Sequence, residues 1–501
     1  MEYDTIVGLE IHVQTKTESK MFCSCPTGYF QKEPNTHVCP VCLGLPGALP
    51  VPNRRAIELC ILMGLATNCT INKNILFDRK HYFYPDLPKG YQISQYKDPI
   101  CSNGKVTLPS GVEIEIERIH QEEDVAKSTH HKEASTNKEY SLIDYNKSGI
   151  PLIEIVTKPC IRSAKDAKDF ATEIQQICRD NKISDADMEK GQMRCEPNIS
   201  IQEKGKWKYE DGKILPIGDY KLNNKVEVKN IGSITAVEKA IEYEVKRLTE
   251  EIANGKEIIQ QTRGWNADKG ITEFQRSKET ADDYRYMPEP DIPVIEIAKE
   301  DIERISKELV ESPAQRRLSF KEKSLLEKRV TELGYDPEGT AWVRENTKFS
   351  LEKAGPTGPS EPDYADFYFG PIKSHMNATG MGWDEISKTD PNTPNDYYRL
   401  SDAKKQGLIT RNKLDEIYKE SLTTGASGAS ILEKTLQESK RSASNLEDIV
   451  KEIIRNNPKA VADYKGGKTS TMGFLVGQVM QSTKGSANPN EAKNILEKLL
   501  K

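Results

Sequence analysis

The fold is decided by one stretch near the N-terminus, Ile6-Val-Gly-Leu-Glu-Ile-His-Val-Gln14. Successive side chains of a β-strand point to opposite faces, so the apolar residues of this stretch share one face and the polar residues share the other. The apolar face holds Val7, Leu9, Ile11 and Val13, and the opposite face holds Gly8, Glu10, His12 and Gln14. The stretch therefore predicts a strand with one buried face and one face that carries an acid and an imidazole. By itself this pattern also fits a solvated sheet surface.

Further β-like runs at 112–119, 152–156 and 226–230 extend this strand into a sheet. One amphipathic helix lies between the last two runs, and a second follows the last run. The first helix begins at Ser163, which precedes Asp166 by three residues as in a capping box. The second helix stops at Asn254-Gly255, a common way for a helix to end. This order of elements predicts an α+β domain built on a large mixed sheet.

A change of pattern after Pro288-Glu-Pro290-Asp-Ile-Pro293 marks a domain boundary. Beyond this stiff stretch the β-like runs nearly vanish, and a helical pattern rich in Lys and Glu takes over. A second change occurs at 423–429, where Gly, Ser and Thr predict a flexible joint followed by short helices. We therefore expect a sheet domain over 1–293, an all-helical domain over 294–422 and a small helical tail domain over 423–501.

The composition of the 501-residue chain, with 36% apolar and 30% charged residues, is typical of a globular protein. The first residues include two acids and no basic segment, and the apolar runs are all shorter than roughly 18 residues, so we expect neither a signal peptide nor a membrane span. The expected location is the cytoplasm. The net charge is −5, but residues 401–501 carry 17 basic against 12 acidic residues. This mildly basic tail predicts phosphate contacts at Lys459, Lys465, Lys468 and Lys484.

Two close cysteine pairs predict a metal site. Cys23-Ser-Cys25 and Cys39-Pro-Val-Cys42 are separated by thirteen residues. Four thiolates at such spacing bind zinc tetrahedrally in a reducing compartment and leave no position open for a substrate. The spacing therefore predicts a structural zinc knuckle over 23–42. The alternative is a set of buried free cysteines without a metal.

Acids that follow or interrupt β-like runs predict a second metal site. His120-Gln-Glu-Glu-Asp-Val-Ala-Lys127 follows one run, and Glu154 lies within the apolar run Pro151-Leu-Ile-Glu-Ile-Val156. A charge among apolar neighbours requires a cation or a partner. Carboxylates with one imidazole can bind Mg²⁺, which also binds substrate phosphates. The alternative is a buried ion-pair network with Lys127 or Lys147.

The sequence holds no complete phosphate loop and no nucleophile elbow. Ala462-Asp-Tyr-Lys-Gly-Gly-Lys468-Thr469 ends like a Walker loop but has Ala in place of its first Gly, and neither G-x-G-x-x-G nor G-x-S-x-G occurs. If the chain uses ATP, it should bind the nucleotide on a metal-bearing sheet face. The block 77–95 mixes cations with aromatic side chains, which fits an anionic or nucleotide ligand and a packed turn equally well.

Taken together, motifs along the whole chain resemble the family of B subunits of bacterial aspartyl/glutamyl-tRNA amidotransferases. These motifs are Glu10-Ile-His12, Phe77-Asp-Arg-Lys-His-Tyr-Phe-Tyr-Pro-Asp-Leu-Pro-Lys89, His120-Gln-Glu-Glu-Asp124, Asp144-Tyr-Asn-Lys-Ser-Gly-Ile-Pro-Leu-Ile-Glu154, Met193-Arg-Cys-Glu-Pro-Asn198, Glu227-Val-Lys-Asn230, Asp282-Asp-Tyr-Arg-Tyr-Met-Pro-Glu-Pro-Asp291 and Gly473-Phe-Leu-Val-Gly-Gln-Val-Met480. One departure is Lys147, which stands where the family has Arg and lacks the bidentate fork of a guanidinium.

The resemblance implies a cradle domain related to glutamine synthetase, a helical domain and a YqeY-like tail that holds tRNA. It also implies an ATP-dependent carbon–nitrogen ligase with glutamine as amido donor. Such an enzyme phosphorylates the side-chain carboxylate of Glu-tRNA(Gln) or Asp-tRNA(Asn) with ATP and Mg²⁺, and ammonia then displaces the phosphate. A partner amidase (glutaminase), the A subunit, supplies the ammonia in a heterotrimer that also contains a small C subunit. The sequence leaves open which of the two tRNAs is the substrate.

The same resemblance implies the site residues. The catalytic residues would be Glu10, His12, Glu123 and Glu154, of which the last three would bind Mg²⁺. Contacts to ATP or to the aminoacyl end of the tRNA would come from Arg79, Lys80, Lys89, Arg194, Glu196 and Lys229. The four cysteines occur in only part of the family, which fits a structural zinc.

Two other functions stay open at this point. A noncatalytic, zinc-containing tRNA-binding scaffold would keep the same acids as structural residues, and it would not turn over ATP with misacylated tRNA. A small-molecule amide ligase like glutamine synthetase would act on free glutamate, although the basic tail favours tRNA.

Overall fold

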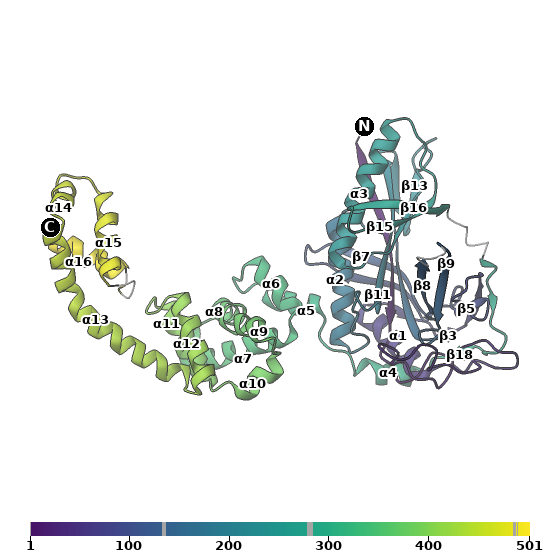
Figure 1. Cartoon of the computed structure of the whole chain (residues 1–501), viewed down its shortest axis with the longest axis horizontal. Helices are drawn as coiled ribbons and strands as arrows, with labels where there is room; N and C mark the ends of the chain where they lie inside the picture. The colour runs from purple at the N-terminus through teal and green to yellow at the C-terminus, as the bar shows by residue number, and fades with distance from the viewer. Residues whose placement is uncertain (1, 133–136, 278–283, 484–486, 488, 501) are drawn as a thin grey trace. The chain divides into compact units, whose positions relative to one another are not determined.

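The computed structural model of the chain describes residues 2–132, 137–277, 284–483, 487 and 489–500. It divides into two compact units, Met1–Ser319 and Phe320–Lys501 (Figure 1). The first unit combines strands with helices, and the second is helical in its described residues, so the predicted α+β class with a helical C-terminal region is confirmed. Lys484 of the predicted tRNA contacts lies outside the described residues, as do Asp282 and Asp283 of the family motif.

A nine-stranded mixed sheet dominates the described part of the first unit. Neighbouring strands are antiparallel except for β14 and β15, which are parallel. The predicted first strand, β1, is at the centre of the sheet. In order from one edge to the other, the strands are β16 (Ile271–Ser277), β15 (Gln261–Asn266), β14 (Val226–Lys229), β11 (Met193–Glu203), β1 (Tyr3–Gln14), β10 (Pro151–Thr157), β7 (Glu113–Glu123), β6 (Cys101–Thr107) and β2 (Thr70–Ile71).

Three helices cover the apolar face of this sheet: α1 (Arg54–Ala66), α2 (Ala164–Asp180) and α3 (Ile234–Ala253). Figure 1 shows α2 and α3 side by side along the sheet. Leu9 and Ile11 of β1 join one core with Phe170 of α2 and Ile241 of α3. The predicted helix ends are confirmed, since the Ser163 hydroxyl accepts a 3.0 Å hydrogen bond from the backbone N–H of Asp166 and α3 ends at Asn254.

Smaller β elements flank the large sheet. In the three-stranded sheet, β5 contacts β7 of the large sheet. The elements are the three-stranded sheet β17 (Met287–Pro288), β4 (Asp78–His81) and β5 (Tyr91–Ser94), and the pairs β18 (Ile295–Glu296) with β3 (Asn74–Ile75), β8 (Lys127–Lys132) with β9 (Glu139–Asp144), and β12 (Trp207–Glu210) with β13 (Lys213–Pro216).

The first unit continues past the predicted boundary at residue 293. Helix α4 (Lys299–Ser306) packs on α1, and its Ile305 belongs to the first core. Helix α5 (Pro313–Phe320) is tied to α2 by an ion pair of 2.6 Å between Arg317 and Glu173. Both contacts are long-range, so a change in local composition could not place the boundary.

The described helices of the second unit pack around two cores. The first core packs the Trp342 ring 5.0 Å from the Tyr397 ring and 5.9 Å from the Tyr364 ring, and the second contains Val450, Leu475 and Leu496. Among the described residues, no helix combines the length and the apolar character needed to cross a bilayer. The helices are α6 (Glu327–Gly334), α7 (Pro337–Ala354), η2 (Gly355–Thr357), α8 (Glu361–Phe367), η3 (Tyr368–Ile372), α9 (Lys373–Thr379), α10 (Trp383–Thr389), α11 (Pro394–Lys405), α12 (Arg411–Thr424), α13 (Gly428–Asn456), α14 (Pro458–Lys465), α15 (Thr471–Ser482) and α16 (Pro489–Leu500).

At the predicted joint, 423–429, the structure has a hydrogen-bonded turn between two helices. Helix α12 ends at Gly425 in the left-handed conformation, and α13 begins three residues later. The N–H of Gly428 donates to the Asn392 side chain at 2.7 Å. The 29-residue α13 then places Ile431 in the first core of the second unit and Leu446 in the second core. The tail therefore shares a continuous helix with the helical domain.

Candidate functional site

Strand register brings the residues of the predicted polar face into one row. His12 on β1 lies opposite Glu154 on β10 and opposite Arg194 on β11. Glu154 in turn lies opposite His120 on β7. Residues directly opposite each other in antiparallel strands share a face, so these four side chains line the same side of the sheet.

His12, Glu122 and Glu154 form an acid–histidine cluster on this face. His12 Nε2 lies 3.5 Å from Glu154 Oε2 and 3.7 Å from Glu122 Oε1, and His120 Nε2 lies 3.3 Å from the same Glu154 oxygen. One ligand atom from each of the three residues lies within 4.8 Å of the others. The side chains of Glu122 and Glu154 are only 3% and 7% exposed. A cation would compensate these two buried negative charges.

A second group of acids shares His12. Ligand atoms of Glu10, His12 and Glu196 also lie within 4.8 Å of one another, and Glu10 Oε1 is 3.7 Å from His12 Nε2. Lys229 Nζ lies 2.9 Å from Glu196 Oε2. The predicted residues Glu10, Glu196 and Lys229 are therefore close to the cluster.

Burial and neighbouring charges perturb the cluster. Burial, reinforced by the charge of Glu154, raises the pKa of Glu10 to about 7. Burial alone would lower the pKa of His12, but the hydrogen bond and charge of Glu154 outweigh it and raise this pKa to about 10. Burial would likewise raise the pKa of Glu154, yet His120 and His12 hold it well below its usual value. Without a metal, the cluster therefore holds an ionised Glu154 carboxylate against a protonated His12, so binding of a metal by His12 would release its proton.

The structure places Glu122, and not the predicted Glu123, on the same face as His12 and Glu154. Adjacent side chains of β7 point to opposite faces, so Glu122 shares a face with His120 and Glu123 does not. Glu122 accepts a 3.2 Å hydrogen bond from the Ser94 hydroxyl, whereas Glu123 pairs with Lys89. Counting in steps of two from His120 would have identified Glu122 in the sequence.

Lys80 faces the cluster from β4. Its Nζ lies 5.0 Å from the centre of the Tyr284 ring. Burial would lower its pKa, but the charges of Tyr286, Glu122 and Glu154 raise this pKa well above its usual value. Lys80 therefore stays charged beside the acids.

Arg79, next to Lys80 in the chain, is held elsewhere. Its guanidinium makes two hydrogen bonds with the Glu289 carboxylate, at 2.7 and 2.8 Å, and a third with Asp291 at 3.2 Å. It also lies 4.4 Å above the centre of the Tyr91 ring. The fork of Arg79 is thus filled by acids of the same chain.

Asp124, which the sequence did not single out, pairs with cationic side chains near the end of β1. It accepts a hydrogen bond of 3.0 Å from Arg194 and one of 2.7 Å from the Gln14 amide, and it forms an ion pair with Lys147. Burial would raise its pKa, but Arg194 and Lys147 hold the pKa below its usual range. Burial also lowers the pKa of Lys147 to about 8. Lys147 is therefore held in an internal ion pair with Asp124.

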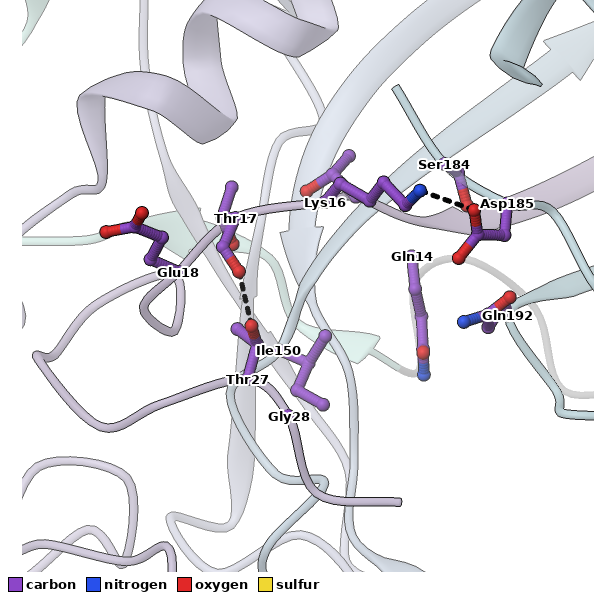
Figure 2. Close-up of a pocket in the computed structure, with 11 residues that line it drawn as sticks. Gln14, Lys16, Thr17, Glu18, Thr27, Gly28, Ile150, Ser184, Asp185 and Gln192 are labelled. Atoms are coloured by element: carbon purple, nitrogen blue, oxygen red, sulfur yellow. Dashed lines mark hydrogen bonds and ion pairs between the residues drawn. The ribbon is translucent and has the colours of Figure 1, made fainter. Parts of the chain in front are cut away.

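A polar pocket of about 320 Å³ opens beside Gln14 (Figure 2). Figure 2 shows Lys16 reaching Asp185, with a distance of 2.5 Å between Nζ and Oδ1, and the Thr27 hydroxyl bonded to the backbone oxygen of Thr17. Since Gln14 also donates to Asp124, the pocket adjoins the Asp124 cluster. The pocket is lined by Gln14, Thr15, Lys16, Thr17, Glu18, Thr27, Gly28, Ile150, Ser184, Asp185 and Gln192.

The four predicted cysteine ligands converge. The Sγ atoms of Cys23, Cys25, Cys39 and Cys42 lie within 4.8 Å of one another. The backbone N–H of Cys39 donates to Cys42 Sγ at 3.2 Å. The Cys23 thiol, together with the Lys20 ammonium 3.7 Å away, lowers the pKa of Cys42 to about 4 against the opposing effect of burial. Four sulfur donors with a stabilised thiolate fit a tetrahedral zinc ion.

The predicted tRNA contacts of the tail are exposed where they are described. Lys459 and Lys465 lie on α14, and Lys468 follows it. The ammonium of Lys468 is 3.4 Å from Asp463. The three side chains are therefore open to an anionic partner.

Comparisons with known proteins cover the whole chain. A family model described as "GatB/GatE catalytic domain" matches residues 5–303, and one described as "GatB domain" matches residues 350–500. The first match contains the acid–histidine cluster and the cysteine knuckle.

Full-length relatives from several bacteria are named as the B subunit of the aspartyl/glutamyl-tRNA(Asn/Gln) amidotransferase. The relative from Thermoanaerobacter pseudethanolicus is 41% identical over 505 residues, which cover 100% of both chains. The relative from Dehalococcoides mccartyi is 42% identical over 509 residues, which cover 100% of this chain and 99% of the relative. The relative from Thermotoga maritima is 40% identical over 504 residues, which cover 100% of this chain and 99% of the relative.

Proposed function

Because the chain belongs to the family of B subunits of aspartyl/glutamyl-tRNA(Asn/Gln) amidotransferases, we propose that it activates and amidates the amino acid carried by a misacylated tRNA. The substrate is Glu-tRNA(Gln) or Asp-tRNA(Asn), and the product is Gln-tRNA(Gln) or Asn-tRNA(Asn). ATP supplies the phosphoryl group. The name of these relatives supports the tRNA substrates and the amidotransferase reaction.

The observation that carries the proposal is the convergence of His12, Glu122 and Glu154 from three adjacent strands. A carboxylate is a poor electrophile until one of its oxygens leaves as phosphate, so the reaction needs a phosphoryl transfer. Phosphoryl transfer depends on neutralising charge rather than on a side-chain nucleophile. Two carboxylates with one imidazole fit Mg²⁺, which when bound would neutralise the phosphates of ATP.

The proposed reaction proceeds in two steps. In the first, a side-chain carboxylate oxygen of the aminoacyl group attacks the γ-phosphorus of ATP, and ADP leaves. In the second, ammonia attacks the carbon of the acyl phosphate, and the bond to the phosphate oxygen breaks. The phosphate leaves with one proton from the nitrogen, so the product is the neutral amide and hydrogen phosphate.

Cations around the cluster would bind the anionic parts of ATP and of the aminoacyl end. Lys80 and Lys229 lie beside the acids of the cluster, and Glu196 orients Lys229 through their ion pair. Lys89 pairs with Glu123, the neighbour of Glu122 on β7, and would contribute from there. Arg79 and Arg194 would also bind phosphate, each by exchanging a carboxylate of the chain for a phosphate oxygen. Carboxylates and phosphates both form charge-assisted hydrogen bonds with a guanidinium.

Partners complete this proposal. We assign the release of ammonia to a glutaminase, the A subunit, held in a heterotrimer with a small C subunit. The designation of the relatives as B subunits supports an assembly of several chains. Lys459, Lys465 and Lys468 of the tail would contact tRNA phosphates, and the four cysteines would hold a structural zinc. We place the assembly in the cytoplasm, where translation uses its product.

The test is an amidation assay with the full chain, its partner subunits, ATP, Mg²⁺ and glutamine, run separately with each misacylated tRNA. Glu154→Gln should lower amidation at least about 100-fold and leave tRNA affinity within about twofold, because it removes a metal-ligand charge without changing the shape of the strand. Glu117→Gln, an exposed acid on the same sheet, is the matched control and should retain activity.

Two results would count against the proposal. A folded Glu154→Gln chain with normal amidation would refute the metal-site assignment. A wild-type assembly that binds misacylated tRNA but neither turns over ATP nor forms the amide would favour the noncatalytic scaffold instead.

A further inference from the structure

Gly44 and Lys89 approach each other so closely that a side chain at residue 44 has no room. Gly44 has a backbone φ of +65°, in the left-handed region. A Cβ at this position would lie 2.5 Å from Cγ of Lys89 and 3.1 Å from its Cα. The stem of Lys89 therefore occupies the space that any other residue would fill.

The cysteine loop fixes the position of Gly44. Its N–H donates to the carbonyl oxygen of Val41 at 3.0 Å, and the N–H of Leu45 donates to that of Pro40 at 2.9 Å. Both acceptors lie between Cys39 and Cys42. The place of Gly44 thus depends on the same loop that carries two of the four sulfur ligands.

The ammonium end of Lys89 contacts β7, the strand that bears Glu122 of the acid–histidine cluster. Its ammonium pairs with Glu123, and its side chain is only 10% exposed. Glu123 is the neighbour of Glu122 on β7 and also accepts a 3.0 Å hydrogen bond from the N–H of Ile93. A continuous path of contacts therefore runs from the sulfur ligands through Gly44 and Lys89 to the strand that bears Glu122.

We propose that the cysteine knuckle positions Lys89, with Gly44 as the positioning residue. The loop that the sulfur ligands hold presses the backbone of Gly44 against the lysine stem and keeps the ammonium on Glu123. A free lysine stem has many rotamers, and a backbone contact removes this freedom before any ligand arrives. This inference concerns the place of one side chain and rests on no step of the proposed reaction.

The test is the rate of chemical acetylation of Lys89 in the folded, full-length chain, followed by mass spectrometry. Lys73, whose side chain is 73% exposed, serves as the internal reference. The variant is Gly44→Ala, and Gly47→Ala is its matched control. Gly47 lies in the same loop region with a φ of +82°, but a Cβ there meets nothing within 4 Å. The two variants share the backbone strain and differ in the contact with Lys89.

Lys89 should be acetylated several-fold faster in Gly44→Ala than in the wild type, while Gly47→Ala matches the wild type and Lys73 reacts equally in all three. Removal of the knuckle metal from the wild type by a chelator should expose Lys89 in the same way. Equal protection of Lys89 in a folded Gly44→Ala chain would overturn the proposal. So would continued protection after the metal is gone.

A double substitution keeps the test decisive if Gly44→Ala does not fold. In Lys89→Ala the crowded Cγ is absent, so Gly44→Ala should lower the melting temperature less in that background than in the wild type. Folding of the double variant where the single variant fails would support the proposal. An unchanged effect of Gly44→Ala in the Lys89→Ala background would contradict it.

Discussion

Glu122 and Glu123 have the same side chain and adjacent positions, yet they belong to different parts of the molecule. Glu122 faces His12 across the sheet, and Glu123 faces Lys89 on the other side of β7. Only the pleat of the strand separates their roles. The pair therefore offers a residue-scale test in which charge, burial and strand are matched.

Replacing Glu122 with Gln should weaken Mg²⁺ binding by about tenfold or more, because the change removes one anionic oxygen donor from the cluster. Glu123→Gln should leave Mg²⁺ affinity within about twofold, since its carboxylate pairs with Lys89. Calorimetric titration of each variant with Mg²⁺ in the presence of a non-hydrolysable ATP analogue measures both values. Equal losses in the two variants would show that Glu122 has no special place in the site.

At the scale of elements, the knuckle is a loop without a helix or strand of its own in the described residues 23–42. Such a loop buries little apolar surface, so a metal is a reasonable source of its stability. The purified chain should contain about one zinc per molecule. Cys39→Ser should lose this zinc and lower the melting temperature by about 5 °C or more.

The matched control for Cys39→Ser is Cys69→Ser. Both cysteines are half-buried, but Cys69 lies outside the knuckle. This control should keep the zinc content of the wild type when metal is measured by atomic emission. A wild-type chain purified without chelator and free of zinc would exclude the structural metal.

The elements that the sequence predicts well are those whose pattern is local. The alternation of Ile6–Gln14 predicts β1, and Ser163 with Asp166 predicts the start of α2, because each signal spans one strand or one helical turn. The choice between Glu122 and Glu123 was missed, since a shift of one residue reverses every side chain of a strand. The pair of Arg317 with Glu173 joins residues 144 apart, and local pattern carries no trace of it.

At the scale of the whole molecule, charge is unevenly distributed along the chain. The tail from residue 401 has a net charge of +5, although the whole chain has −5. Because α13 belongs to two cores, deleting the tail at residue 423 would also remove Ile431 from the helical domain. Substitution of exposed lysines is therefore a cleaner test of tRNA binding than truncation.

The triple variant of Lys459, Lys465 and Lys468 to Ala should bind tRNA more weakly. The slope of log affinity against log salt should shrink by up to about 3, since each lost phosphate contact releases about one counterion fewer. Nitrocellulose filter binding over a series of salt concentrations measures this slope. A matched triple variant of Lys328, Lys348 and Lys434, which are also exposed, should keep the slope of the wild type. Equal effects of the two variants would remove the tail lysines from the tRNA-binding surface.

Because helix α13 contributes residues to both cores of the second unit, we expect the two cores to unfold cooperatively. Unfolding of the tail would begin to unwind α13, which contributes Ile431 and Leu432 to the neighbouring core. Loss of the tail core therefore destabilises the folded state of the helical core. A protein with two separately hinged modules would release them one at a time on heating or in denaturant. Here the backbone amides of the tail and of the helical core should exchange with deuterium in a single opening event. A ligand that binds the tail should therefore also stabilise the helical core.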